Sequence, residues 1–320
     1  MKRQRDIDAL KGFGILLVVL GHVNPGFYIE KWIYSFHMFL FFFLAGITFS
    51  KKGFKTRLML DIKNLLFPYL FWNGICIMFS LIIGEYSIAD ALKYLLFIEK
   101  VSWNAPIWFL VVLFFLRVLG EVVLSTNTKL CDRVKYICSL LIAFILGYIC
   151  VFPRFLGFDI VPTVFIFFCL GYIYKMNNKN INIFFIIFLI GLNVYLSFIN
   201  ERISVYGNYY GRYVIAVIAG VCGVLACYYT AKRLYARFRL RILEILGIYS
   251  FNIMCSHYLI LRFFNYLSIQ LCGYDLWHSV SIIKAILVTV MVIVLELLLV
   301  YIMKKFRIPS TKIWRIGKIQ

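Results

Sequence analysis

The chain has 320 residues, of which 63% are hydrophobic and 15% are charged, and its mean hydropathy is +0.90. A soluble globular domain has about 45–50% apolar and about 25% charged residues, so this composition excludes that class and indicates an integral membrane protein. The formal net charge of +20 would suggest nucleic-acid binding in a soluble protein. In a membrane protein, an excess of positive charge instead follows from topology, because lysines and arginines gather in the cytoplasmic segments. We therefore expect no nucleic-acid partner.

Apolar stretches long enough to cross a bilayer recur along the chain, and we predict about ten helices of roughly 17 to 25 residues each. Most lysines and arginines lie in one set of connecting segments and at the two chain ends, whereas the opposite set carries as many acidic as basic residues. By the positive-inside rule, we expect both termini to be cytoplasmic. The prediction is an all-α, multi-pass protein of the cell membrane with a single membrane domain over residues 1–320. The predicted spans start near Leu10, Trp32, Ile62, Pro106, Val134, Phe158, Ile181, Gly211, Ile245 and Val280.

An imidazole interrupts the first apolar segment. His22 lies in the run that begins at Leu10, and an ionisable side chain inside a membrane span is a candidate functional residue. Lys11 precedes His22 by eleven residues, which places both on one helical face, roughly 16 Å apart along the axis. Asp8 lies within about 40° of the same face. The first segment therefore aligns an acid, a base and an imidazole.

A second imidazole, His37, lies near the outer end of the second predicted span, shortly after a turn at Asn24-Pro25-Gly26. A lone histidine in a membrane often only hydrogen-bonds a neighbouring helix. Two histidines in adjacent helices make a shared site more plausible, so we expect His22 and His37 to face one cavity.

The remaining charged residues, the external segment and the cysteines are each interpreted as structural. Arg117 and Glu121 are four residues apart on one predicted helix and are expected to neutralise each other. The external stretch 88–98 has the pattern of a short amphipathic helix. The nine cysteines are odd in number and show no Cys-x-x-Cys pair, so we expect neither structural disulfides nor a metal site.

Several short motifs together resemble the membrane-bound acyltransferase-3 superfamily, and within it the fucose 4-O-acetylase-like branch. The resemblance covers nearly the whole chain, and its specificity lies in the order and spacing of the motifs. The motifs are Arg5-Asp-Ile-Asp8-Ala-Leu-Lys11-Gly12, Gly21-His22, Phe36-His37-Met38, Phe41-Phe-Phe-Leu-Ala-Gly46, Leu66-Phe-Pro68-Tyr69-Leu-Phe-Trp72, Pro106-Ile-Trp108-Phe109-Leu110, Phe168-Cys-Leu-Gly171-Tyr and Leu246-Gly-Ile-Tyr249-Ser250 with His257.

The resemblance implies an enzyme that moves an acyl group, usually acetyl, from cytoplasmic acyl-CoA to a hydroxyl of a carbohydrate. By that implication His22 is the catalytic histidine, acetyl-CoA is the donor, and no cofactor is permanently bound. Many members carry arginine where Lys11 stands, and lysine keeps the charge but loses the bidentate fork suited to phosphate. Members also tend to have proline and serine where this chain has Phe39 and Ala45.

The expected chemistry assigns roles to further residues. An imidazole is the usual base for removing the proton of a hydroxyl that attacks a thioester, and we assign this role to His22, with His37 as its companion. Donor phosphates are expected at a basic cytoplasmic mouth, and acceptor or oxyanion contacts on polar side chains of the outer half. The expected donor-binding residues are Lys11, Arg57 and Lys63, and the expected substrate-binding residues are Asn73, Trp108 and His257.

Alternatives remain for several of these assignments. Lys11 also fits an ordinary positive-inside anchor, and His257 a structural hydrogen-bond hub. The basic run 232–241 fits anionic lipid headgroups better than a nucleotide. At the level of the whole protein, a transporter or flippase for glycan intermediates would share the basic cytoplasmic face and the aromatic interior.

Overall fold

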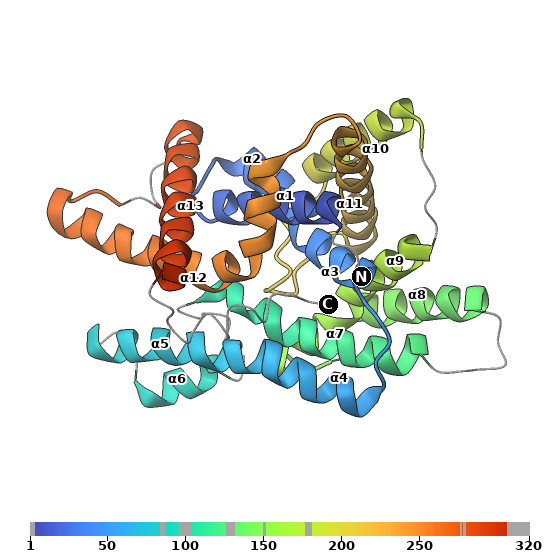
Figure 1. Cartoon of the computed structure of the whole chain (residues 1–320), viewed down its shortest axis with the longest axis horizontal. Coiled ribbons are helices and arrows are strands. Elements are labelled where there is room, and N and C mark those ends of the chain that lie inside the picture. The colour runs from blue at the N-terminus through green and yellow to red at the C-terminus, as the bar shows by residue number, and fades with distance from the viewer. Residues whose placement is uncertain are drawn as a thin grey trace. The chain divides into compact units, whose positions relative to one another are not determined.

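A computed structural model describes residues 4–83, 87–95, 104–125, 132–149, 152–176, 181–275, 277 and 280–305 (Figure 1). Within these ranges the chain is helical, and its only β feature is an isolated antiparallel bridge between Ser204 and Tyr209. The α-helices are α1 (Arg5–Gly21), α2 (Phe27–Tyr34), α3 (His37–Ile47), α4 (Phe54–Asp61), α5 (Phe67–Ile83), α6 (Ile88–Leu95), α7 (Trp108–Ser125), α8 (Asp132–Ile149), α9 (Val161–Met176), α10 (Ile183–Ile199), α11 (Tyr213–Tyr235), α12 (Arg241–Cys272) and α13 (Ile282–Lys305).

The chain divides into two compact units. Unit 1 is drawn from Met1–Met38, Asn180–Ile203 and Tyr210–Gln320, and it contains α1, α2 and α10 to α13. Unit 2 is drawn from Phe39–Lys179 and Ser204–Tyr209, and it contains most of α3 together with α4 to α9. The single membrane domain therefore stays a prediction, and each unit is described by itself.

Unit 1 is organised by a close parallel contact between α1 and α12. A Cβ atom added at Gly12 would lie 2.0 Å from the carbonyl oxygen of Leu243, and one added at Gly247 would lie 1.7 Å from that of Asp8. Small residues let helix backbones approach in this way inside membranes. Ten residues further along both helices, His22 meets His257, so the two helices stay paired over about 15 Å.

Unit 2 contains a second backbone-to-backbone helix contact, between α3 and α9. A Cβ atom at Gly46 would lie 2.0 Å from the carbonyl oxygen of Phe168, and one at Gly171 would lie 1.9 Å from that of Phe43. The phenylalanines of α3 fill the space around this contact, and Phe43 is fully buried. The apolar motif of the second predicted span is therefore core rather than lipid-facing surface.

Six helical stretches in the described ranges are long and apolar enough to cross a membrane, and two shorter apolar helices cover 134–149 and 183–199. Each apolar segment expected from the sequence contains a helix, which confirms the all-α fold for the described residues. The count of about ten spans and the cytoplasmic placement of both termini stay predictions. The six stretches are Phe54–Ile82, Ala105–Leu124, Phe155–Lys175, Tyr213–Tyr235, Arg241–Cys272 and Ile282–Ile302.

The second predicted span is broken in the structure. Helix α2 ends at Tyr34 and α3 begins at His37, with a turn at Ser35 and Phe36 between them. The hydroxyl of Ser35 donates to the carbonyl oxygen of Trp32 at 2.7 Å and accepts from the amide of Asn193 on α10 at 3.1 Å. The Ser35 hydroxyl thus bonds one carbonyl oxygen in the last turn of α2, where the regular helical hydrogen bonds stop. His37 therefore starts a helix rather than extending one.

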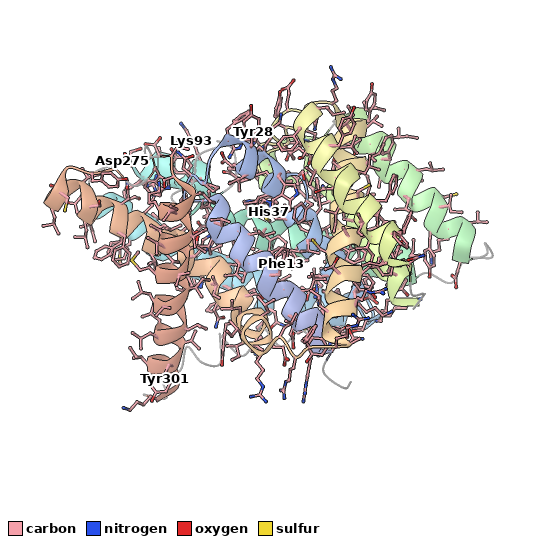
Figure 2. The ribbon with its side chains drawn as sticks, turned by 90° about the horizontal axis from the view of Figure 1, so that it is seen from above. Phe13, Tyr28, His37, Lys93, Asp275 and Tyr301 are labelled. Carbon is pink, nitrogen blue, oxygen red and sulfur yellow. The ribbon has the colours of Figure 1, made fainter. Side chains whose placement is uncertain are left out.

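The expected external helix is present as α6, although its end at 96–98 lies outside the described residues. Ser87 precedes its first residue, and its backbone amide donates to the carboxylate of Asp90 at 3.1 Å, while its hydroxyl accepts from the Asp90 backbone amide at 3.2 Å. This reciprocal pair is a capping box, which explains where the helix begins. Hydrogen bonds from the Ser87 side chain and backbone lower the pKa of Asp90. Lys93, on the same helix, is labelled in Figure 2.

Candidate functional site

The end of α1 holds His22 in a fixed backbone position. Helix α1 stops at Gly21, and the next residues turn sharply, with Asn24 in the left-handed region at φ 52°. The indole N–H of Trp277 donates to the carbonyl oxygen of His22 at 2.9 Å, and the amide of Asn24 donates to the carbonyl oxygen of Trp277 at 2.8 Å. A residue 255 positions away along the chain thus holds the backbone of the predicted base.

Aromatic and imidazole rings of α12 surround the His22 side chain. The ring of His257 lies 5.5 Å from that of His22, and the ring of Tyr258 lies 5.2 Å from it, edge to face. Tyr258 in turn contacts Trp277 at 6.3 Å. His257 is fully buried, whereas His22 is half-buried. His22 is therefore the more exposed residue of this pair.

His37 approaches the same group from the start of α3. Its ring packs edge to face against Tyr34 at 4.9 Å, and the Tyr34 hydroxyl donates to the carbonyl oxygen of Gly21 at 3.4 Å. His37 and His22 are close enough to interact electrostatically. Figure 2 shows His37 among the helices of unit 1, with Tyr28 at the edge. We call His22, His37 and His257 the histidine cluster.

Two of the three histidines have their tautomers set by the helix backbone. Nδ1 of His257 lies 2.6 Å from the carbonyl oxygen of Ile253, and Nδ1 of His37 lies 2.8 Å from that of Ile33. A carbonyl oxygen only accepts, so in the neutral ring Nδ1 carries the hydrogen and Nε2 is an acceptor. The cluster therefore combines one partly exposed histidine with two buried rings whose Nε2 atoms are hydrogen-bond acceptors.

A cation lies beside the histidine cluster. The guanidinium of Arg202, which follows α10, stacks on the ring of Tyr34 at 4.4 Å and forms an ion pair with Glu30. It is also close enough to interact electrostatically with His22. Sequence reasoning did not single out Arg202, Tyr34, Tyr258 or Trp277, because their relation to the site depends on contacts between distant segments.

Lys11 lies on α1, eleven residues before His22, which is the residue that follows this helix. Its ammonium group is 3.9 Å from the carboxylate of Asp8, and both side chains are partly exposed. The N-cap of α1 is Gln4, so Asp8 interacts with Lys11 and does not cap the helix. The structure thus places the acid and the base of the predicted alignment side by side, and the alignment of His22 with them stays a prediction.

Arg57 is buried in an ionic network of unit 2, with a side chain only 1% exposed. Its Nε lies 3.3 Å from Glu121 and its Nη1 3.6 Å from Asp61, while Nε of Arg117 lies 2.9 Å from Asp61. Arg117 and Glu121, expected to pair with each other, thus each have a partner on α4. Lys63 follows in a π-helix (Ile62–Leu66) and is exposed.

Asn73 and Trp108 also belong to unit 2. Asn73 is buried on α5, and Trp108 opens α7, with its ring 6.0 Å from that of Tyr206. The guanidinium of Arg154 also lies over the ring of Tyr206, with 5.0 Å between the guanidinium carbon and the ring centroid. The structure thus unites His22, His37 and His257 in unit 1, whereas the roles of Asn73 and Trp108 stay predictions.

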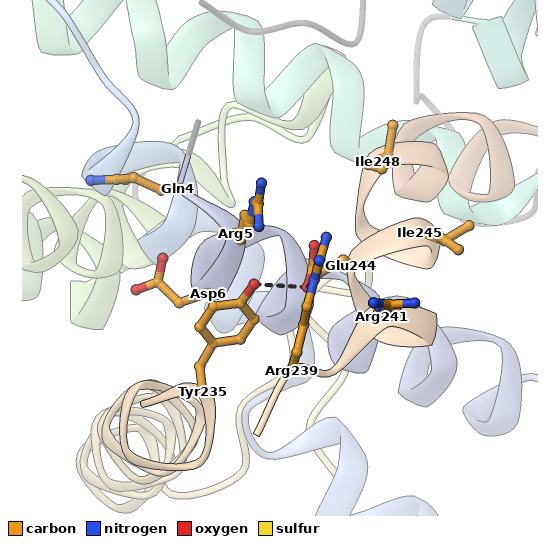
Figure 3. Close-up of a pocket in the computed structure, with 9 residues that line it drawn as sticks. All are labelled: Gln4, Arg5, Asp6, Tyr235, Arg239, Arg241, Glu244, Ile245 and Ile248. Atoms are coloured by element: carbon orange, nitrogen blue, oxygen red, sulfur yellow. Dashed lines mark hydrogen bonds and ion pairs between the residues drawn. The ribbon is translucent and has the colours of Figure 1, made fainter. Parts of the chain in front are cut away.

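A cavity of about 760 Å³ opens at the N-terminal end of α1 (Figure 3). The Tyr235 hydroxyl donates to Glu244 at 2.7 Å, and Nε of Arg239 lies 3.4 Å from the same carboxylate oxygen. In Figure 3 the carboxylate of Asp6 points away from this pair. We call this cavity the arginine pocket. Its lining residues are Gln4, Arg5, Asp6, Tyr235, Arg239, Arg241, Glu244, Ile245 and Ile248.

Among the residues that the structure describes, no three His, Cys, Asp or Glu side chains converge as metal ligands would. Comparison with protein-family models matches residues 4–303 to the family described as an acyltransferase domain. Searches of curated proteins and of solved structures found no match. The matched range includes every candidate residue named above.

Proposed function

Because the chain belongs to the acyltransferase-3 superfamily, we propose that it is a membrane O-acetyltransferase that moves acetyl from acetyl-CoA to a glycan hydroxyl. The observation that carries this proposal is the partly exposed His22, held at the end of α1 beside two buried histidines. The charge asymmetry of the sequence supports cytoplasmic termini in the cell membrane, with the acetyl-CoA site on the cytoplasmic side. The motif resemblance supports the fucose 4-O-acetylase-like branch.

In the proposed reaction His22 acts as a general base. Its unprotonated ring nitrogen takes the proton of the acceptor hydroxyl while the hydroxyl oxygen attacks the thioester carbonyl carbon. The C–O bond forms, the carbonyl becomes an oxyanion, and the C–S bond then breaks as the carbonyl reforms. The imidazolium then gives the proton to the departing thiolate, so the products are the acetyl ester and free CoA, and His22 is neutral again.

The charged end of α1 supports donor binding. Arg5 and Arg241 line the arginine pocket, and Lys11 lies between that pocket and His22 on the same helix. The pocket lies about 25 Å from His22 along α1. An elongated donor with phosphates at one end and a thioester at the other suits this separation. Arg57 is less available to a donor, since carboxylates already surround its guanidinium.

The experiment measures acetyl-CoA-dependent ester formation on glycans in membranes that contain equal amounts of each variant. We expect wild-type protein to form ester and His22→Ala to form none. Leu20→Ala is the matched control, since Leu20 is also half-buried near the end of α1 and removes no ionisable group. Normal ester formation by His22→Ala would refute the assigned base. If wild-type protein neither binds nor consumes acetyl-CoA, the transporter or flippase alternative is favoured.

A further inference from the structure

The least satisfied polar atom in the histidine cluster is Nε2 of His257. The His257 residue is 0% exposed, and its Nε2 is buried without a hydrogen-bond partner in the described part of the chain. Leaving a buried acceptor unpaired costs about 1–3 kcal/mol. Such atoms are uncommon in folded proteins and call for a specific explanation, because evolution can remove the cost with an apolar side chain.

The other ring nitrogen of His257 shows that its orientation is fixed. Nδ1 donates to the carbonyl oxygen of Ile253, one turn earlier on α12, at 2.6 Å. This bond leaves Nε2 with a lone pair and no hydrogen. The ring is thus anchored on one side by its own helix and presents an acceptor on the other side.

The ring of His22 needs a hydrogen-bond acceptor. Within the described residues no hydrogen bond is made by its ring, although its carbonyl oxygen is bonded to Trp277. An imidazole that works as a base requires its second nitrogen to carry a hydrogen, and a fixed acceptor for that hydrogen sets both the tautomer and the ring orientation. The His257 ring is in direct contact, with 5.5 Å between ring centroids.

We propose that His257 is the positioning residue for His22, accepting through its Nε2 the ring N–H of His22 when substrates are bound. This inference rests on the proposed acetyl transfer and deepens it. As His22 takes the hydroxyl proton, its ring becomes positively charged, and the N–H directed at His257 becomes a stronger donor. The proton stays on His22 until the thiolate leaves. His37 has a similarly set tautomer, but its ring contact is with Tyr34.

Two conservative replacements of His257 separate this role from a structural one. Asn places its amide near Nδ1 and keeps the donor to Ile253, but it removes the acceptor facing His22. Gln places an amide oxygen near Nε2 and keeps that acceptor, but it loses the donor to Ile253. If His257 is only structural, Asn therefore preserves activity. If His257 positions His22, Gln preserves it.

The experiment measures kcat and KM for acetyl-CoA in purified wild-type, His257→Asn and His257→Gln proteins. We expect His257→Asn to lose roughly 10- to 100-fold in kcat with little change in KM, as when an imidazole loses its orienting acceptor. We expect His257→Gln to retain most of kcat. The reverse order, or equal activity of both variants and wild type, would overturn the proposal.

A second measurement does not depend on acetyl transfer. Diethyl pyrocarbonate acylates an unprotonated imidazole nitrogen, and mass spectrometry gives its rate of reaction at His22 for each protein. We expect His22 to react more slowly in His257→Asn than in wild type and His257→Gln, by a factor similar to that in kcat. An unchanged rate would refute the positioning role. If the rates follow this order while no acetyl transfer occurs, the proposed function fails and the pairing of His22 with His257 stands.

Discussion

Replacing Gly247 with alanine should disrupt the site from a distance. The new Cβ atom would lie 1.7 Å from the carbonyl oxygen of Asp8. Ordinary van der Waals contact begins at 3.4 Å, so α1 and α12 would have to separate by roughly 1–2 Å to admit the methyl group. His22 and His257 lie on these two helices about 15 Å further along, so their contact would be displaced.

The expected losses of stability and of rate in Gly247→Ala follow from the packing of α1 against α12. Overpacking of a tight contact costs about 1–3 kcal/mol, which exceeds the gain of up to about 1 kcal/mol that alanine has over glycine in a helix. A misplacement of about 1 Å at a reacting centre can cost roughly 100-fold in rate. We therefore expect Gly247→Ala to lower the thermal midpoint of the purified protein and to reduce acetyl transfer by about two orders of magnitude.

Gly191→Ala is the matched control, because Gly191 also lies in a helix of unit 1 and a Cβ atom there has no neighbour within 4 Å. This control should leave activity unchanged and the thermal midpoint equal or slightly higher. Thermal unfolding followed by intrinsic fluorescence and initial rates of CoA release measure both effects. Wild-type stability and activity in Gly247→Ala would refute the close contact of α1 with α12.

Three further substitutions test other parts of the structure. Arg57→Ala removes the cation that pairs with Glu121, while Asp61 keeps Arg117, and breaking this buried pair should cost about 3–5 kcal/mol in unfolding free energy, whereas the exposed Lys55→Ala should have no measurable effect; equal midpoints would contradict the ionic network. Trp277→Phe removes the N–H that holds the His22 carbonyl and should reduce kcat several-fold with a loss of about 1 kcal/mol in stability; an unchanged kcat would show that this bond is dispensable. Arg241→Ala should raise KM for acetyl-CoA without changing kcat, and an unchanged KM would remove the arginine pocket from donor binding.

The helical segments of this protein are predictable from the sequence because each is a long apolar run, and each of the ten runs contains a helix. The break between Tyr34 and His37 is not predictable from the sequence, since the apolar pattern continues through it and the bond of Ser35 to Asn193 joins two distant segments. The capped helix from Ile88 was predicted, because its periodicity is local.

The histidine cluster was predictable in part. His22, His37 and His257 were singled out as ionisable residues in apolar runs or in motifs, and the structure places them in one unit. Their geometry was not predictable, because Trp277 is 255 residues from the carbonyl that it holds.

The partners of the buried charged residues are also not predictable from the sequence. The spacing of Arg117 and Glu121 suggested a pair within one helix, whereas the structure supplies Arg57 and Asp61 of α4 as partners. Spacing along one helix identifies residues on a common face, but it carries no information about which neighbouring helix covers that face.

The central claim is that acyl chemistry takes place at His22, and a reactive analogue of the donor tests it most directly. Bromoacetyl-CoA carries its alkylating carbon in place of the acetyl methyl group, one bond from the thioester carbonyl, and peptide mass spectrometry of the labelled protein identifies the alkylated residue. We expect alkylation at His22, which excess acetyl-CoA prevents and which His22→Ala abolishes. Protectable labelling of another residue, with His22 unmodified, would contradict it.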